Sequence, residues 1–203
     1  MRRSGGARLV RAMVCAVALA APATAAWAEE SGSGSVGRPL AVGVQLDLFP
    51  TIVSAANGKL GYAPQIWIGI DHLRLRLIGA HLEPPDAFAF DDDFEDPTST
   101  VLAAVVDYTF GERFDGWWLS GGFEVWERTV RHEGSRDELA WTSIIGTIGG
   151  GYIWRFAGDF YVDPWLGVHA TLNPETIEGA GFEYEPPAVV ANASVKIGWF
   201  SAW

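Results

Sequence analysis

The sequence predicts an all-β fold, an up-and-down antiparallel barrel of about eight strands. Apolar and polar residues alternate along most of the chain after residue 38, and in each run they separate onto two faces. Side chains two residues apart share a face in a strand, whereas successive residues of a helix lie about 100° apart around its axis. The predicted strands lie at residues 40–48, 60–70, 73–77, 102–110, 117–128, 142–154, 160–172 and 189–199.

In the first four runs, leucine, isoleucine and valine dominate one face, and the other face is polar. The polar face holds Asp47 in the first run, Gln65 in the second, Arg74 and Arg76 in the third and Asp107 in the fourth. This alternation has the period of a strand with one apolar and one polar surface.

The last four runs repeat the pattern with more glycine, serine and threonine on the polar face. Glu124 and Arg128 lie on this face in the fifth run, Asp163 and His169 in the seventh and Lys196 in the last. Small residues fill the polar face of the sixth run, which includes a series of glycines. Such residues permit close packing between strands.

The connections between the predicted strands alternate in length. Those at 71–72, 111–116 and 155–159 are short, and those at 50–59, 83–99, 131–140 and 173–187 are longer. Short periplasmic turns and long external loops are typical of bacterial outer-membrane barrels. Pro64 and Pro164 fall inside predicted strands, where each removes a ladder hydrogen bond, so we expect bulges at both positions.

The polar faces are predicted to point into a narrow lumen, and the apolar faces are predicted to meet lipid. Acids and bases balance on the polar faces, as expected for an interior filled by ion pairs. The expected lumen charge network is Asp47, Arg74, Arg76, Asp107, Glu124, Arg128, Asp163 and Lys196. Aromatic residues near the strand ends predict girdles at the two membrane interfaces. They are Tyr108, Phe110, Trp117, Trp154 and Phe160 near the short turns, and Phe49 and Trp141 near the longer loops.

The first 28 residues have the order of a secretory signal peptide. An arginine-rich start precedes an apolar run around Cys15, and Ala26-Trp27-Ala28 has small residues at both key positions, which predicts cleavage near Ala28. We therefore divide the chain into a signal peptide (1–28), a flexible leader (29–37) and a barrel (38–203). The single cysteine would leave with the signal peptide, which excludes a disulfide framework in the mature chain.

The C-terminal strand carries a more specific resemblance. Ile197, Trp199 and the terminal Trp203 lie on one face, which resembles the assembly signal of bacterial outer-membrane barrels, with Trp in place of the more frequent Phe. Together with the signal peptide and the alternation, this ending resembles small barrels of the OmpA transmembrane-domain type. The resemblance implies residence in the bacterial outer membrane. It also implies that outer-membrane lipid and the barrel-assembly machinery are partners, and it identifies no functional subfamily.

We expect a non-enzymatic protein with a plugged lumen that serves membrane integrity, surface interaction or small-ligand binding. An eight-stranded barrel has an interior just wide enough for side chains to fill. Arg74 and Arg76 would then pair with Asp47 and Asp107 on flanking strands. We expect a monomer without cofactor or metal. The chain's net charge of −11 makes nucleic acid an unfavourable partner.

Two alternatives stay open. His169, Thr171 and the downstream Glu183 resemble the residue pattern of outer-membrane lipid A deacylases, although Thr171 stands where that family has a serine. A hydroxyl beside a base is the chemistry that ester cleavage needs. The other alternative is a soluble periplasmic barrel with its apolar face turned inward.

The connection at residues 83–96 is strongly acidic and contains no basic residue. Clustered carboxylates can bind Ca²⁺, but the spacing lacks the turn glycine of an EF-hand loop. We therefore predict a solvated external loop. Phe88, Phe90 and Phe94 alternate with the acids and could fold this loop over the barrel mouth.

Overall fold

A computed structural model describes residues 40–203, except residues 90, 112, 174–175 and 180. The predicted signal peptide and leader therefore lie outside the described residues. The elements are β1 (Leu40–Asp47), α2 (Phe49–Ala56), β2 (Pro64–Ile70), β3 (Leu73–Leu82), η2 (Asp86–Phe88), β4 (Phe94–Thr109), β5 (Gly116–His132), β6 (Glu138–Phe156), β7 (Phe160–Thr171), β8 (Ile177–Gly179), β9 (Phe182–Tyr184) and β10 (Val189–Ala202).

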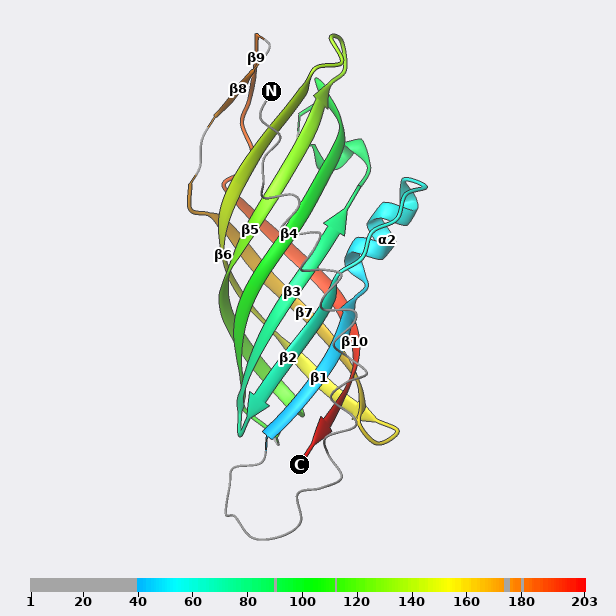
Figure 1. Ribbon diagram of the computed structural model, residues 1–203, viewed down its shortest axis with the longest axis vertical. Helices are drawn as coiled ribbons and strands as arrows, with labels where there is room; N and C mark the ends of the chain where they lie inside the picture. Colours follow the sequence, from blue (N-terminus) through cyan, green and yellow to red (C-terminus); the bar gives the residue numbers. More distant parts are fainter. Residues whose placement is uncertain (1–39, 90, 112, 174–175, 180) are drawn as a thin grey trace.

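Eight antiparallel strands close into a barrel in the order β1-β10-β7-β6-β5-β4-β3-β2 (Figure 1). Strand β1 pairs with β2 on one side and with β10 on the other, which closes the ring. The predicted fold class is confirmed, and each predicted strand lies largely within an observed one. The described N-terminal start and the C-terminus share the end that carries the short turns (the short-turn end), and the longer connections gather at the opposite long-loop end.

Strands β3 to β6 extend further toward the long-loop end than the alternation predicted. Strand β4 begins at Phe94 and β6 at Glu138, well before the apolar runs that marked them. In the extension of β4 the outward-facing positions Thr98 and Thr100 are polar. The alternation therefore disappears while the strand hydrogen bonds continue.

Two of the long connections contain structure that the sequence analysis treated as loop. Helix α2 occupies most of residues 50–59, and its proline lies at the first turn, where a missing N–H is tolerated. Strands β8 and β9 form a small hairpin within residues 173–187. Both elements are too short for periodicity to detect.

The expected bulges at Pro64 and Pro164 are not found. Pro64 is the first residue of β2, where a strand tolerates proline. At Pro164 the register of β7 with β10 stays constant, and the β6 ladder omits only the facing residues Tyr152 and Ile153. The register shift lies in β4 instead, between Glu95 and Thr98, where Asp96 adopts φ 51° beside Pro97.

The apolar faces of the strands point outward, and the polar faces point inward. Phe123, Ile148 and Leu166 are each about two-thirds exposed, whereas Asp107 and Asp163 are fully buried. This arrangement is the reverse of a soluble barrel with an apolar pocket, and it removes that alternative. Within the described part of the chain, no helix has the length and apolar character to cross a membrane.

One of the two predicted aromatic girdles is present. Tyr108, Phe110, Trp117, Trp154 and Phe160 are all exposed near the short turns. The second girdle was predicted wrongly. Trp141 points inward and donates from Nε1 to Ser143 Oγ, and Phe49 packs against a buried apolar cluster, because both occupy lumen-facing positions.

Glycines on the inner faces make room for aromatic rings from the next strand. Gly43 lies opposite Trp67 and Gly198 opposite Tyr161. A Cβ atom added at either glycine would overlap the facing ring. Each glycine therefore lets a large ring lie flat across the neighbouring backbone, as aromatic side chains do beside strand glycines.

Candidate functional site: the barrel lumen

A cluster of buried aromatic and apolar side chains, here called the aromatic floor, packs inside the barrel at the short-turn end. Phe114 from the β4–β5 turn packs with residues from the ends of several strands. The floor consists of Ala41, Trp67, Phe114, Trp118, Ile153, Tyr161 and Phe200. The ring centroids of Trp67, Phe114 and Phe200 lie 5.1–6.0 Å apart, a range that favours tilted and edge-to-face packing.

A chain of hydrogen bonds connects this floor to the charged residues above it. Trp67 Nε1 donates to the Tyr161 hydroxyl at 2.9 Å, and that hydroxyl donates to Gln45 Oε1 at 2.6 Å. The Gln45 amide donates to Gln65 Oε1, which also accepts from Arg76 Nη1 at 2.9 Å. The network ties strands β1, β2, β3 and β7 together across the lumen.

Asp107 is the main partner of both arginines. Its Oδ2 atom accepts from Arg74 Nε at 2.6 Å and from Arg76 Nε at 2.7 Å, and its Oδ1 accepts from Arg76 Nη2 at 2.8 Å. All three side chains are buried. Arg74 faces Asp107 directly across the β3–β4 ladder, so strand register explains the pairing.

Asp163 and Lys196 form the second part of this charge layer. Asp163 accepts from Trp118 Nε1 at 2.8 Å, and its other oxygen lies 3.5 Å from Arg74 Nη2 and 3.6 Å from Lys196 Nζ. The Lys196 ammonium lies 4.7 Å from the Trp118 ring centroid and 4.4 Å from that of Trp165. Cation–π contacts of this kind stabilise a desolvated ammonium.

Asp47 does not make the expected contact with the arginines. Its carboxylate accepts hydrogen bonds from Ser194 Oγ, from the Phe49 amide and from Trp165 Nε1. Asp47 faces Lys196 on β10, on the side of β1 that lies away from β2 and β3. Its role is therefore to fix the start of α2 and the Trp165 ring.

The remaining charged positions of the predicted network lie closer to the long-loop end. Glu124 accepts from Trp126 Nε1 at 2.6 Å, and its Oε1 lies 3.3 Å from His169 Nδ1. The Arg128 guanidinium lies 4.5 Å from the Trp126 ring centroid. Arg128 Nε is buried without a hydrogen-bond partner among the described residues.

The three residues of the deacylase-like pattern have separate surroundings. His169 faces Glu124, and the Thr171 hydroxyl donates to the Pro187 carbonyl at 3.4 Å. Glu183 lies in β9, opposite Glu178 of the small hairpin. Neither ring nitrogen of His169 makes a hydrogen bond with any described residue, so His169 is not placed as a base for Thr171.

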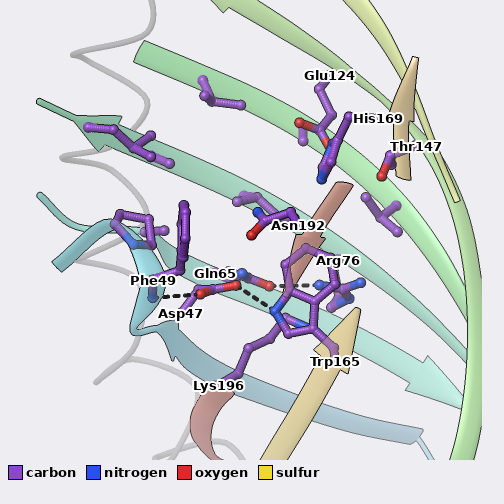
Figure 2. A pocket seen from close by; sticks show the side chains of 18 of the residues that line it. Asp47, Phe49, Gln65, Arg76, Glu124, Thr147, Trp165, His169, Asn192 and Lys196 are labelled. Carbon is purple, nitrogen blue, oxygen red and sulfur yellow. Dashed lines mark hydrogen bonds and ion pairs between the residues drawn. The ribbon is translucent and has the colours of Figure 1, made fainter. Parts of the chain in front are cut away.

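Two neighbouring cavities occupy the lumen above the charge layer. The inner chamber, with a volume of about 100 Å³, is lined by residues that include Asp47, Arg76, Glu124, His169 and Lys196 (Figure 2). The outer chamber, of about 400 Å³, lies toward the long-loop end. Phe49, Leu82, Trp126, His169 and Asn192 line both chambers.

Salt bridges hold part of the acidic long-loop end together. Arg131 pairs with Asp96 at 2.5 Å and Arg136 with Glu95 at 2.5 Å. Phe94 is buried against Tyr184 and Val130. The described residues contain no group of three His, Cys, Asp or Glu side chains that could hold a metal.

Lys59 bridges Asp96 and Glu83 at 3.2 and 3.4 Å. Burial acts to lower the pKa of Lys59, but the two carboxylates raise it above its ordinary value. Burial likewise acts to raise the pKa of Glu83, but hydrogen bonds and charges from His81 and Lys59 bring it below its ordinary value. Both groups are therefore held in their charged forms at neutral pH.

The residues of the predicted assembly signal lie on the outer surface. Ile197 and Trp203 are each nearly half exposed, and Trp199 is partly exposed on the same face of β10. The backbone amide of Trp203 donates to the Leu40 carbonyl at 3.1 Å, which joins the C-terminus to the start of β1.

Sequence reasoning missed the aromatic residues of the lumen. Trp67, Trp118 and Tyr161 are among the most buried side chains, yet apolar character alone suggested no inward direction for them. Strand parity was the available signal, because Trp67 lies between the outward residues Ile66 and Ile68.

Comparison with solved structures shows that the fold is shared with outer-membrane barrels. The N-terminal β-barrel domain of OprF from Pseudomonas aeruginosa matches with a TM-score of 0.51 and 14% identity, covering 81% of this chain and 98% of that one. A major outer membrane protein from Thermus thermophilus matches with a TM-score of 0.52 and 8% identity, covering 80% and 99%.

The fold is that of a small outer-membrane barrel. The predicted architectural resemblance is thus confirmed at the level of the fold. No protein-family model and no curated protein matches the sequence.

Proposed function

We propose that the chain is an exported protein of the bacterial outer membrane, with a non-conducting lumen and no catalytic role. The observation that carries this proposal is the orientation of the strand faces. Large apolar side chains cover the outside of the barrel, while arginine, lysine and aspartate side chains are buried inside. A soluble monomer rarely exposes apolar patches beyond a few hundred Å², whereas an outer-membrane barrel presents such a band to lipid.

The closed lumen is supported by two layers that block it in succession. The aromatic floor fills the short-turn end, and the Arg74, Arg76, Asp107, Asp163 and Lys196 layer lies above it. An ion path would have to displace side chains that bond one another across the barrel. Membrane integrity and contacts of the acidic long-loop end with other molecules are the roles that such a barrel can serve.

A non-enzymatic role is supported by the separation of the residues that a hydrolase would need. The Thr171 hydroxyl donates to a backbone carbonyl, and His169 lies inside the barrel beside Glu124, away from the surface that lipid would meet. An acyl-chain substrate would need both groups at the outer surface.

Fractionation tests the membrane placement. The full chain is produced in a Gram-negative host, and its membranes are separated on a density gradient. We expect recovery with the outer membrane and a gel mobility that changes on boiling, because barrels of this kind resist unfolding until heated. Recovery as a soluble periplasmic protein would overturn the proposal.

Recording in planar lipid bilayers tests the closed lumen on the same purified protein. We expect no discrete channel openings from the unmodified chain. The positive control is the double variant Trp118→Ala and Tyr161→Ala. It removes two rings of the aromatic floor and should raise the rate of ion passage. Regular, charge-selective channels from the unmodified chain would show that the lumen is a water-filled path.

A further inference from the structure

The outer chamber is built by adjacent positions on neighbouring strands. Ser99 on β4 faces Arg128 on β5, and Arg128 faces Trp141 on β6. Two residues further along each strand, at the border with the inner chamber, Val101 faces Trp126, which in turn faces Ser143. These positions all point into the lumen, so one face of the chamber combines a cation with two indole rings.

The chamber has the size and composition of a small-molecule site. Its volume of about 400 Å³ lies within the range of about 300–1,000 Å³ that ligand pockets occupy. Aromatic side chains surround it, with Phe49 and Phe88 completing the set formed by Trp126, Trp141 and Tyr184. Rings placed in this way suit a flat apolar ligand, because they offer stacking and edge contacts.

Several buried polar atoms of residues that line the chambers form no hydrogen bond with a described residue. His169 is nine-tenths buried and borders both chambers, and neither of its ring nitrogens makes a hydrogen bond with a described residue. Arg128 Nε and Asn192 Oδ1 are likewise buried without such a bond. Buried polar groups normally find a partner, and each one left without a bond is destabilising. In Figure 2 His169 and Asn192 lie at the chamber between Glu124 and the charge layer.

The charge of the site favours an anion at Arg128. Glu124 already accepts from Trp126 and faces His169, and Arg128, which stacks on Trp126, forms no ion pair with a described carboxylate. A guanidinium binds a carboxylate through paired, charge-assisted hydrogen bonds. A ligand that carries both an aromatic ring and a carboxylate would therefore satisfy Arg128 and fill the apolar chamber.

From this geometry we infer that the outer chamber binds small aromatic carboxylates, with Arg128 holding the carboxylate and Trp126 and Trp141 contacting the ring. The inference deepens the proposed function, since it requires a barrel closed below the chamber. It also explains why a lumen blocked at one end keeps an apolar recess at the other.

Equilibrium dialysis tests the site with the full barrel refolded in lipid nanodiscs. The probe is 2-naphthoate, and its uncharged counterpart is 2-naphthalenemethanol. Empty nanodiscs measure the partition of each compound into lipid. We expect saturable binding of one naphthoate per barrel, at least tenfold tighter than binding of the alcohol.

Three variants assign the binding to this chamber. Arg128→Gln should weaken naphthoate binding at least tenfold and leave the alcohol unaffected. Ser99→Trp should abolish binding of both compounds by filling the chamber, and Arg136→Gln, in an exposed loop, should change neither. Each variant is first checked for the gel shift on boiling, so that only folded barrels are compared.

The outcomes separate this inference from the proposed function. Absence of saturable binding by a barrel that is folded and fractionates with the outer membrane would overturn the inference alone. Equal affinity for naphthoate and alcohol, or naphthoate binding that survives Arg128→Gln, would also overturn it. A chain that is recovered in soluble form would overturn the proposed function first.

Discussion

Asp107 lies at the centre of the charge layer, because it accepts hydrogen bonds from both Arg74 and Arg76 while fully buried. A buried ion pair contributes little net stability compared with an apolar replacement, but removal of one partner leaves an unpaired buried charge. Single substitutions in this layer are therefore far more costly than the same substitutions on the surface.

We predict that Arg74→Ala lowers the free energy of unfolding by about 3–5 kcal/mol, measured by denaturant titration in detergent. Arg136→Ala removes an exposed ion pair with Glu95 and should cost about 0–1 kcal/mol. Equal small losses in both variants would contradict burial of the charge layer.

A double-mutant cycle then identifies the partner of Arg74. We expect Arg74→Ala and Asp107→Ala to couple by about 0.5–3 kcal/mol, because the two side chains touch. Arg74→Ala and Asp47→Ala should add independently, because Asp47 bonds Ser194 and Trp165 instead.

Gly198 lies opposite Tyr161 of β7, and the Tyr161 ring lies against the glycine backbone. We predict that Gly198→Ala destabilises the barrel by about 1–3 kcal/mol, because the new methyl group overlaps the Tyr161 ring. Gly121→Ala is the matched control, since only a backbone oxygen 3.9 Å away lies near its Cβ position. Thermal or denaturant unfolding compares the two, and equal stability would mean that Tyr161 moves aside freely.

Helix α2 and the residues that follow it are attached to the β3–β4 connection and to the start of β4 by several bonds. The Glu83 amide donates to Ser54 Oγ at 2.9 Å, and Lys59 bridges Glu83 and Asp96. Phe49 and Val53 of the helix pack against the apolar cluster around Ala80 and Val101, which lines the inner chamber. Phe49 also lines the outer chamber, so the helix forms part of the wall of both.

The Lys59 bridge predicts that α2 is attached most firmly near neutral pH. Because the pKa of Glu83 is lowered in the folded protein, Glu83 contributes stability at pH values above its unfolded-state pKa. This stability is lost as the pH falls through its folded-state pKa. Because the pKa of Lys59 is raised in the folded protein, Lys59 contributes stability at pH values below its unfolded-state pKa. This stability is lost as the pH rises through its folded-state pKa. Hydrogen-exchange protection of the α2 amides, corrected for intrinsic exchange rates, should decrease when the pH is either lowered or raised from neutral. Glu83→Gln should remove the acid-side loss, and an unchanged profile would contradict the bridge.

Strand β10 is both a closing strand and the predicted assembly signal. We predict that deletion of Trp203 reduces assembly in cells more than it reduces the stability of refolded protein, because Trp203 adds only one backbone bond to β1 and is nearly half exposed. The two measurements are the amount of heat-modifiable protein in the outer membrane and the denaturant midpoint in detergent. Equal relative losses would show a purely structural role for Trp203.

For the whole molecule, the decisive property is that the apolar side chains lie outside the ring. Phe123 is two-thirds exposed, six residues beyond Trp117 of the aromatic girdle on β5. In a lipid bilayer this position lies within the apolar band that surrounds outer-membrane barrels.

We predict that Phe123→Arg destabilises the barrel in lipid vesicles by about 2–4 kcal/mol, because the charge would lie in hydrocarbon. Phe123→Leu keeps the position apolar and serves as the control. In a barrel surrounded by water, the arginine would change stability by about 0.5 kcal/mol or less, and that result would reject the membrane placement.

The strands, their approximate number and the presence of two chemically distinct faces could be predicted from the sequence, because the period of a strand is visible in neighbouring residues. Asp107 was named as a partner of Arg74 and Arg76 on the same basis. The ends of β4 and β6 and the helix α2 could not be predicted, because polar strand extensions and short helices give no periodic signal. The inward aromatics were missed although strand parity places Trp67 on the polar face, because apolar character alone suggested an outward direction.

The alternation, and hence the strands, can be derived from the sequence alone, since the direction of a side chain in a strand depends only on the local backbone. Tertiary structure decided which carboxylate meets which cation. Asp47 was expected to pair with the arginines, but closure of the ring places it beside Ser194 and Trp165. It also decided that Phe49 and Trp141 line a chamber with Arg128 and His169. Such contacts depend on the register of strands that are distant in the sequence, and no local pattern specifies that register.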